Sequence, residues 1–170
     1  NGDYELFWVS IDPYNNKEGH FGFAVSSSGV LNDGYFTREW NEDGFNYDTV
    51  FDAKISLNEN NWTVEMIIPY SAIRFPESEI QDWGINFSRR IRDFEESYTW
   101  NPTDIRTYSW PEQLGLVKDI KSLKPPLTTA TTPAALLPFV SVFVKDKVSP
   151  ILYPVPALSI TISVILPGPI

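Results

Sequence analysis

The tryptophans are the residues whose side chains point most directly to a binding chemistry. The chain has six Trp among 170 residues. A flat indole face can stack on the apolar C–H face of a sugar ring while polar neighbours bind the hydroxyls. Three Trp lie in polar loop sequences, where either ligand binding or structural packing would explain them: Trp40, Trp100 and Trp110. The other three fall inside alternating strand patterns and are predicted to be core residues: Trp8, Trp62 and Trp83.

Two arginines could recognise polar groups of a ligand. Arg74 lies beside Phe75, and its planar guanidinium could bind sugar hydroxyls or a carboxylate. Arg89 continues the inward row of a predicted strand. A buried arginine needs an acidic partner, and Glu65 and Asp93 are the candidates. The alternative for the basic cluster at residues 89–92 is a solvated, salt-bridged edge strand.

A loop at residues 12–19 is dense in the carboxylate and amide oxygens that calcium prefers. The candidate ligands are Asp12, Asn15, Asn16 and Glu18. Their spacing is not that of an EF-hand, and an ordinary Asp/Asn/Gly turn explains the same residues. The sequence therefore leaves a weak calcium site and a simple turn open. The single histidine, His20, ends this turn and is interpreted as a packing residue.

The composition argues against several functional classes. A net charge of −9, from 13 Lys and Arg against 22 Asp and Glu, argues against nucleic-acid binding. The absence of Cys excludes disulfides, Cys-ligated zinc and thiol catalysis. No phosphate-binding Gly loop, nucleophile elbow or metalloprotease motif is present. The many Asp and Glu leave a glycosidase-like carboxylate pair open, although no spacing picks one out.

The elements that must position these residues are β-strands. Strict alternation predicts strands at 21–25 and from 83 onward, and a hairpin of 51–57 with 62–68. A first strand is predicted at 6–11, apolar on both faces, and one helical turn at 70–75. No segment shows a sustained helical period. The sequence therefore predicts an all-β fold, an antiparallel β-sandwich with hairpin connections.

The composition divides the chain into residues 1–124 and residues 125–170. The first part holds 32 of the 35 charged residues, while the second holds nine of the 14 Pro. The boundary falls at Lys124-Pro125-Pro126, a typical linker sequence. We expect a β-sandwich domain in the first part and a Pro-rich apolar tail in the second.

Three stretches in order resemble the carbohydrate-binding module family 9-like domain, a β-sandwich of the DOMON-like type. They are residues 9–16 with the following Gly22–Val25, then Trp62–Phe75, then Trp83–Arg92. The similarity is greatest to the version at the N-terminus of large secreted or outer-membrane proteins of Bacteroidetes-type bacteria, which precedes a membrane β-barrel. It covers roughly residues 3–124.

The resemblance implies binding of a poly- or oligosaccharide by a non-catalytic module of an exported glycan-processing system. Such a module would be periplasmic, outer-membrane-associated or extracellular, and any hydrolysis of O-glycosyl compounds would belong to a neighbouring domain. Family members clamp the sugar between Trp rings, and several carry calcium. We therefore expect the ligand-binding residues to be Trp40, Glu65, Arg74, Asn86, Arg89, Trp100 and Trp110. The alternatives are a docking domain of its own downstream β-barrel without sugar affinity and, third, a glycoside hydrolase.

The sequence departs from this family at both ends. Strands expected before Asn1 are missing, so the resemblance predicts a sandwich that is incomplete at the N-terminus. In the tail, Leu158, Ile160, Ile162 and Val164 alternate with polar residues, as in a barrel strand. The nine prolines argue against a regular barrel wall. A frameshifted or mis-joined end would explain both observations, and resequencing the coding region would test it.

Overall fold

The computed structural model describes residues 5–38, 42–58, 61–91, 95–104, 106, 109–121, 123, 125, 141–144 and 159–167. For the last two ranges it describes the backbone. These ranges contain β-strands and three short 3-10 helices: η1 (Glu42–Asn46), η2 (Tyr70–Ala72) and η3 (Trp110–Gln113). In this part of the chain no helix has both the length and the apolar character needed to cross a membrane.

Six strands form the larger sheet, called sheet A. The order is β3-β2-β1-β6-β7, and β8 also pairs with β6. Every pairing is antiparallel. The long strand β6 has two partners on one edge, since β8 pairs with its first half and β7 with its last residues. The strands are β1 (Leu6–Asp12), β2 (Gly19–Ser26), β3 (Leu31–Thr37), β6 (Ile80–Ile91), β7 (Glu96–Thr99) and β8 (Gly115–Lys121).

Four strands form the second sheet, called sheet B, in the order β4-β5-β10-β9. The predicted hairpin is confirmed as β4 and β5, which turn between Asn58 and Asn61. β10 pairs antiparallel with β5, and β9 pairs parallel with β10. This last pair departs from the antiparallel prediction. The strands are β4 (Asp52–Asn58), β5 (Asn61–Pro69), β9 (Ser141–Val144) and β10 (Ser159–Pro167).

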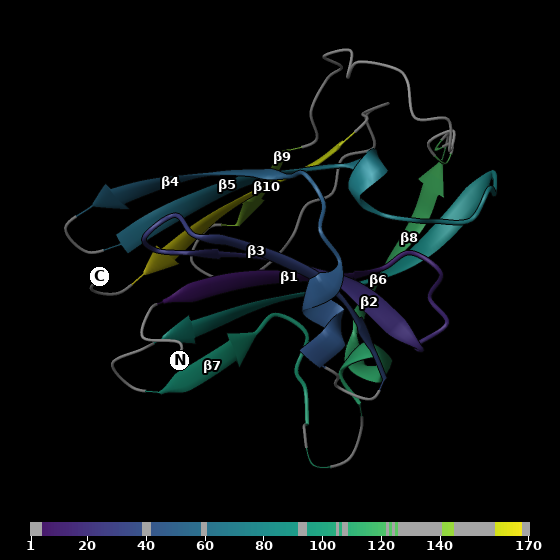
Figure 1. Ribbon diagram of the computed structural model, residues 1–170, viewed down its shortest axis with the longest axis horizontal. Coiled ribbons are helices and arrows are strands. Elements are labelled where there is room, and N and C mark those ends of the chain that lie inside the picture. The colour runs from purple at the N-terminus through teal and green to yellow at the C-terminus, as the bar shows by residue number, and fades with distance from the viewer. Residues whose placement is uncertain are drawn as a thin grey trace.

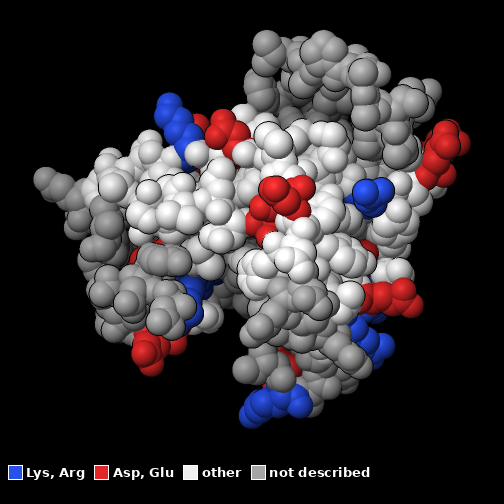
Figure 2. All heavy atoms as spheres, viewed as in Figure 1, with Lys and Arg blue, Asp and Glu red and all other residues white. Residues whose placement is uncertain are grey.

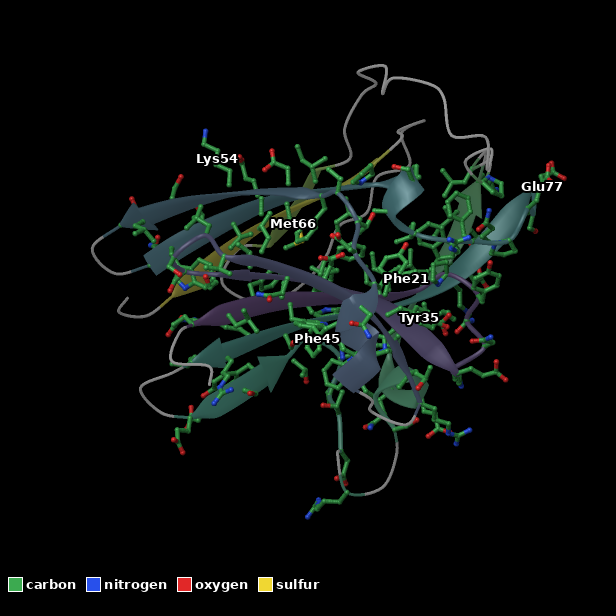
Figure 3. The ribbon with its side chains drawn as sticks, in the orientation of Figure 1. Phe21, Tyr35, Phe45, Lys54, Met66 and Glu77 are labelled. Atoms are coloured by element: carbon green, nitrogen blue, oxygen red, sulfur yellow. The ribbon has the colours of Figure 1, made fainter. Side chains whose placement is uncertain are left out.

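The two sheets form a β-sandwich, as the alternating pattern predicts (Figure 1). Its core is made by inward rows of β1, β2 and β6 on sheet A and of β5 on sheet B. Figure 3 labels Met66 between the two layers. Burial of such rows is the main source of stability for a sheet pair. The core positions of Trp62 and Trp83 are confirmed, and η2 confirms the predicted helical turn.

The outer face of sheet A carries a second, smaller packed cluster. Trp8 alternates with Phe7 and Val9, so it lies on this outer face rather than in the core between the sheets, where we expected it. There the buried ring of Phe36 packs against Trp8 at 5.4 Å and against His20 at 5.5 Å between ring centroids. The interpretation of His20 as a packing residue is confirmed.

Glycines make room for this outer cluster. A Cβ on Gly22 would lie 2.3 Å from a ring carbon of Trp8 and 2.9 Å from one of Phe36. A Cβ on Gly34 or on Gly44 would lie 2.6 Å from a carbon of the Phe36 ring. The aromatic rings therefore lie directly on the backbone of β2 and β3.

Replacing Gly22 with Ala is expected to lower the free energy of unfolding by about 1–3 kcal/mol, because the added methyl group overpacks Trp8 and Phe36. Urea denaturation measures this loss. Gly84→Ala is the matched control on the same sheet, since its Cβ would meet nothing nearer than 3.3 Å. Equal losses in the two variants would contradict this packing explanation.

Candidate functional site

Arg89 is buried between the sheets rather than open to a ligand. Its guanidinium donates from Nε at 3.2 Å and from one terminal nitrogen at 2.7 Å to Oε2 of Glu5. The same oxygen accepts the indole N–H of Trp62 at 3.0 Å. Arg89 therefore has an acidic partner, as its inward position requires, but the partner is Glu5. Glu65 is exposed on β5, and Asp93 lies outside the described residues.

The structure does not place Arg74 and Glu65 beside Arg89. Arg74 is exposed after η2, and its guanidinium interacts with the phenol of Tyr47. Burial raises the pKa of Tyr47, and Arg74 partly offsets this rise. Glu65 faces out from the middle of β5, paired in register with Lys54 and Ser163. Trp40 lies outside the described residues.

Asn86 and Trp100 hold the loop that follows β7. Asn86 is completely buried on the outer face of β6. Its amide nitrogen donates to the carbonyl of Asn101 at 3.1 Å, and its oxygen accepts the Asn101 backbone N–H at 2.9 Å. The ring of Trp100 packs edge-to-face on Phe87 at the border of the core and lies against Gly115. Both predicted contact residues thus form part of the scaffold.

Trp110 lies half-buried over the outer face of sheet A. It begins η3, which is capped by reciprocal hydrogen bonds between Ser109 and Glu112. The indole N–H of Trp110 donates to Oγ of Ser10 at 2.9 Å, and the indole of Trp8 donates to the same oxygen at 3.1 Å. Ser10 is completely buried, so one hydroxyl fixes two indole rings.

Replacing Ser10 with Ala is expected to lower the free energy of unfolding by about 1–3 kcal/mol, because both indole donors lose their acceptor. Chemical denaturation provides the measurement. Ser56→Ala is the control: it makes the same chemical change at an exposed position of β4 and should alter stability by less than about 0.5 kcal/mol. If the loss at Ser10 were no larger, the indole bonds would contribute nothing measurable.

The oxygen-rich loop between β1 and β2 is a turn organised by Asp12. Its carboxylate accepts the backbone N–H of Tyr14 at 3.1 Å and of Lys17 at 3.0 Å, one on each oxygen. Burial raises the pKa of Asp12, and these backbone bonds oppose the rise. Asn16 and Glu18 bond to each other at 3.1 and 3.2 Å. The turn interpretation is therefore confirmed.

The same contacts bear on the predicted calcium site. Both oxygens of Asp12 and one of Glu18 already accept hydrogen bonds within the loop. Within the described ranges, no three or more His, Cys, Asp or Glu side chains gather closely enough to hold a metal ion. Calcium binding by Asp12, Asn15, Asn16 and Glu18 thus stays a prediction.

Two tyrosines beside this loop were not singled out by the sequence. Tyr14 is 51% exposed in the turn, and Tyr35 is 39% exposed on the edge strand β3. One side of the Tyr35 ring packs against Phe21, with centroids 5.0 Å apart (Figure 3). Burial raises the pKa of Tyr35, and nearby Asp12, Glu18 and Tyr14 raise it further. Both phenols therefore lie within electrostatic reach of one another and of the acidic loop.

The arrangement joins a half-exposed aromatic pair to carboxylate and amide groups. A supported phenol ring can stack on an apolar ligand face, while Glu18 and Asn16 can exchange hydrogen bonds with hydroxyl groups. We define Tyr14, Tyr35, Asn16 and Glu18 as the tyrosine site.

Across the view in Figure 2, acidic and basic side chains are scattered among large uncharged areas.

Nothing in the sequence spacing marks the tyrosine site, because Tyr14 lies in a turn and Tyr35 in a strand whose alternation is weak.

The comparisons with known proteins do not assign this chain to a family. No protein-family model, no curated protein and no solved structure matches this chain, so its similarity to the carbohydrate-binding module family 9-like domain stays a prediction.

Proposed function

We propose that the chain is a non-catalytic carbohydrate-binding β-sandwich that works in an exported glycan-processing system. The observation that carries this proposal is that the exposed rings of Tyr14 and Tyr35 lie within electrostatic reach of one another and of Glu18, which accepts a hydrogen bond from Asn16. The resemblance of residues 3–124 to a carbohydrate-binding family supports the same class of ligand.

In the proposed complex, a sugar ring lies on the exposed side of Tyr35. Phe21 supports the other side of this ring, so little side-chain freedom is lost on binding. The carboxylate of Glu18 accepts hydrogen bonds from sugar hydroxyls, and the amide of Asn16 can both donate and accept.

Replacing Tyr35 with Ala is expected to weaken glycan binding about tenfold, equivalent to about 1.4 kcal/mol, because the stacking surface is removed. The wild-type chain is first screened against soluble poly- and oligosaccharides by intrinsic Trp and Tyr fluorescence, with and without calcium. Calorimetric titration then compares the dissociation constants of wild type, Tyr14→Ala and Tyr35→Ala.

The control is Tyr98→Ala, which removes an exposed tyrosine from β7 at the opposite edge of sheet A. It should bind as the wild type does. An equal loss in all three variants would contradict the tyrosine site. A folded wild-type chain that binds no glycan in the screen would contradict the proposed function itself.

A docking domain without sugar affinity is the second candidate. Asn86 and Arg89, two of the predicted sugar contacts, are buried and engaged in hydrogen bonds that hold the fold together. Residues that serve the scaffold in this way need no ligand. Association of the folded chain with its own downstream membrane domain, together with a negative glycan screen, would favour this candidate.

A further inference from the structure

The hydroxyl end of the Tyr35 ring lies on the backbone of Gly19, where strand β2 begins. Tyr35 is paired in register with Phe21, and Gly19 is its diagonal neighbour on the same face of the sheet. A Cβ on Gly19 would lie 2.5 Å from the hydroxyl oxygen of Tyr35 and 2.8 Å from its Cζ. Because Gly19 directly follows Glu18, its missing side chain brings the phenol to the acidic turn.

Negative charge exceeds positive charge in this turn. The carboxylate of Glu18 is exposed, and that of Asp12 is buried where the turn begins. Arg38 donates its backbone N–H to the carbonyl of Glu18 at 2.7 Å, but its guanidinium forms an ion pair with Glu112. In the described turn, two carboxylates are therefore accompanied by one ammonium group, that of Lys17.

An aromatic ring beside a carboxylate is a favourable environment for an organic cation. An ammonium group is attracted to the negative face of a tyrosine ring, and a carboxylate accepts its N–H donors in charge-assisted hydrogen bonds. Oε2 of Glu18 accepts one hydrogen bond from Asn16 at 3.2 Å, and a carboxylate can accept several. An anionic ligand would instead be repelled by the two carboxylates.

We propose that the tyrosine site recognises amino sugars, whose ring carries a protonated amine; this inference rests on the carbohydrate-binding function proposed above. The apolar face of the sugar ring lies on Tyr35, and its ammonium group lies toward Glu18. Each exposed contact of this kind contributes modestly, and together they favour an amino sugar over its neutral counterpart about tenfold. Sugars that carry a carboxylate or a sulfate are disfavoured.

Three oligosaccharides of the same linkage and length distinguish the charge of the amine from the shape of the sugar. They are built from glucosamine, N-acetylglucosamine or glucose, so they differ in one substituent of each ring. Calorimetric titration of the full chain at pH 6, where the amine is protonated, gives the dissociation constants. We expect the glucosamine oligomer to bind about tenfold more tightly than the other two, and this difference to shrink as the salt concentration rises.

Glu18→Gln removes the charge of the side chain and keeps its shape. In this variant we expect the preference for the glucosamine oligomer to fall to about threefold or less. The matched control is Glu96→Gln, because Glu96 also lies beside an exposed tyrosine and accepts the hydroxyl of Tyr98 at 2.5 Å, at the opposite edge of sheet A. This control variant should keep the full preference.

The outcomes separate this inference from the proposed function. Equal affinities of the wild-type chain for all three oligosaccharides, or binding only to other glycans, would overturn the amino-sugar preference and leave carbohydrate binding intact. A preference that is the same in Glu18→Gln and Glu96→Gln would also overturn it, because attraction to the net charge of −9 would then explain the binding. A folded chain that binds no glycan would contradict the proposed function, and the preference with it.

Discussion

Replacing Arg89 with Met is expected to lower the free energy of unfolding by about 3–5 kcal/mol, a large part of the stability of an ordinary domain. The substitution leaves the carboxylate of Glu5 buried between the sheets with the indole of Trp62 as its remaining named donor. Burying an ionised carboxylate between the sheets without a partner cation strongly destabilises the folded state. Guanidinium denaturation, with far-UV circular dichroism as the signal, gives the loss.

A double variant distinguishes the loss of stability caused by an unpaired buried carboxylate from the loss caused by repacking the core. Removing both charges in Glu5→Leu with Arg89→Met leaves no buried ion. Replacement of a buried pair by apolar residues of similar size is often neutral or stabilising. The double variant should therefore recover most of the stability that Arg89→Met loses. A double variant as unstable as the single one would show that packing, rather than charge, determines the result.

The strands of this fold are predictable because their signal is local. Alternation in β5 and β6 needs only neighbouring residues, and it correctly places Trp62 and Trp83 in the core. The β4–β5 hairpin is equally local, since a polar turn separates its strands. The same rule fails for Trp8. Strand β1 is apolar on both faces, so alternation does not tell which face points towards the core.

The contacts that decide the candidate site are not local, and the sequence gives no clue to them. Arg89 is paired with Glu5, 84 positions away, and not with Glu65 or Asp93, which the sequence analysis predicts as its partners. The tyrosine site joins a turn to an edge strand through the β2–β3 pairing. Both cases depend on sheet topology, which periodicity alone does not specify.

The outer cluster is the reason that the proposed binding site was placed at the edge of sheet A and not in the middle of its outer face. Phe36 and two indole rings, those of Trp8 and Trp110, already cover the middle of that face. Gly22 and Gly34 let these rings approach the backbone closely. The β3 edge of this sheet and the adjoining turn carry the half-exposed side chains of Tyr35 and Tyr14.

Lowering the pH from 7 to 4 is expected to cost the wild-type chain about 3 kcal/mol of stability through His20 alone. Burial lowers the pKa of His20 from 6.5 to about 4, and its Nδ1 is buried without a hydrogen-bond partner. The unfolded chain therefore binds the proton more readily. The stabilising contribution of neutral His20 is fully present above pH 6.5, declines below it, and is lost once the pH passes the folded value near 4.

A non-titrating variant isolates this contribution from the other acid-sensitive groups. Asp12 also titrates in this region, and its raised pKa acts in the opposite direction, since the folded state binds that proton more readily. In His20→Phe and His20→Gln the Asp12 contribution persists while the histidine contribution disappears. Subtracting either variant's stability from that of the wild type at each pH should therefore give a curve that is flat above pH 6.5 and falls by about 3 kcal/mol towards pH 4. Parallel curves for wild type and variants would mean that the buried imidazole accepts its proton without unfolding the outer cluster that Phe36 and Trp8 form around it.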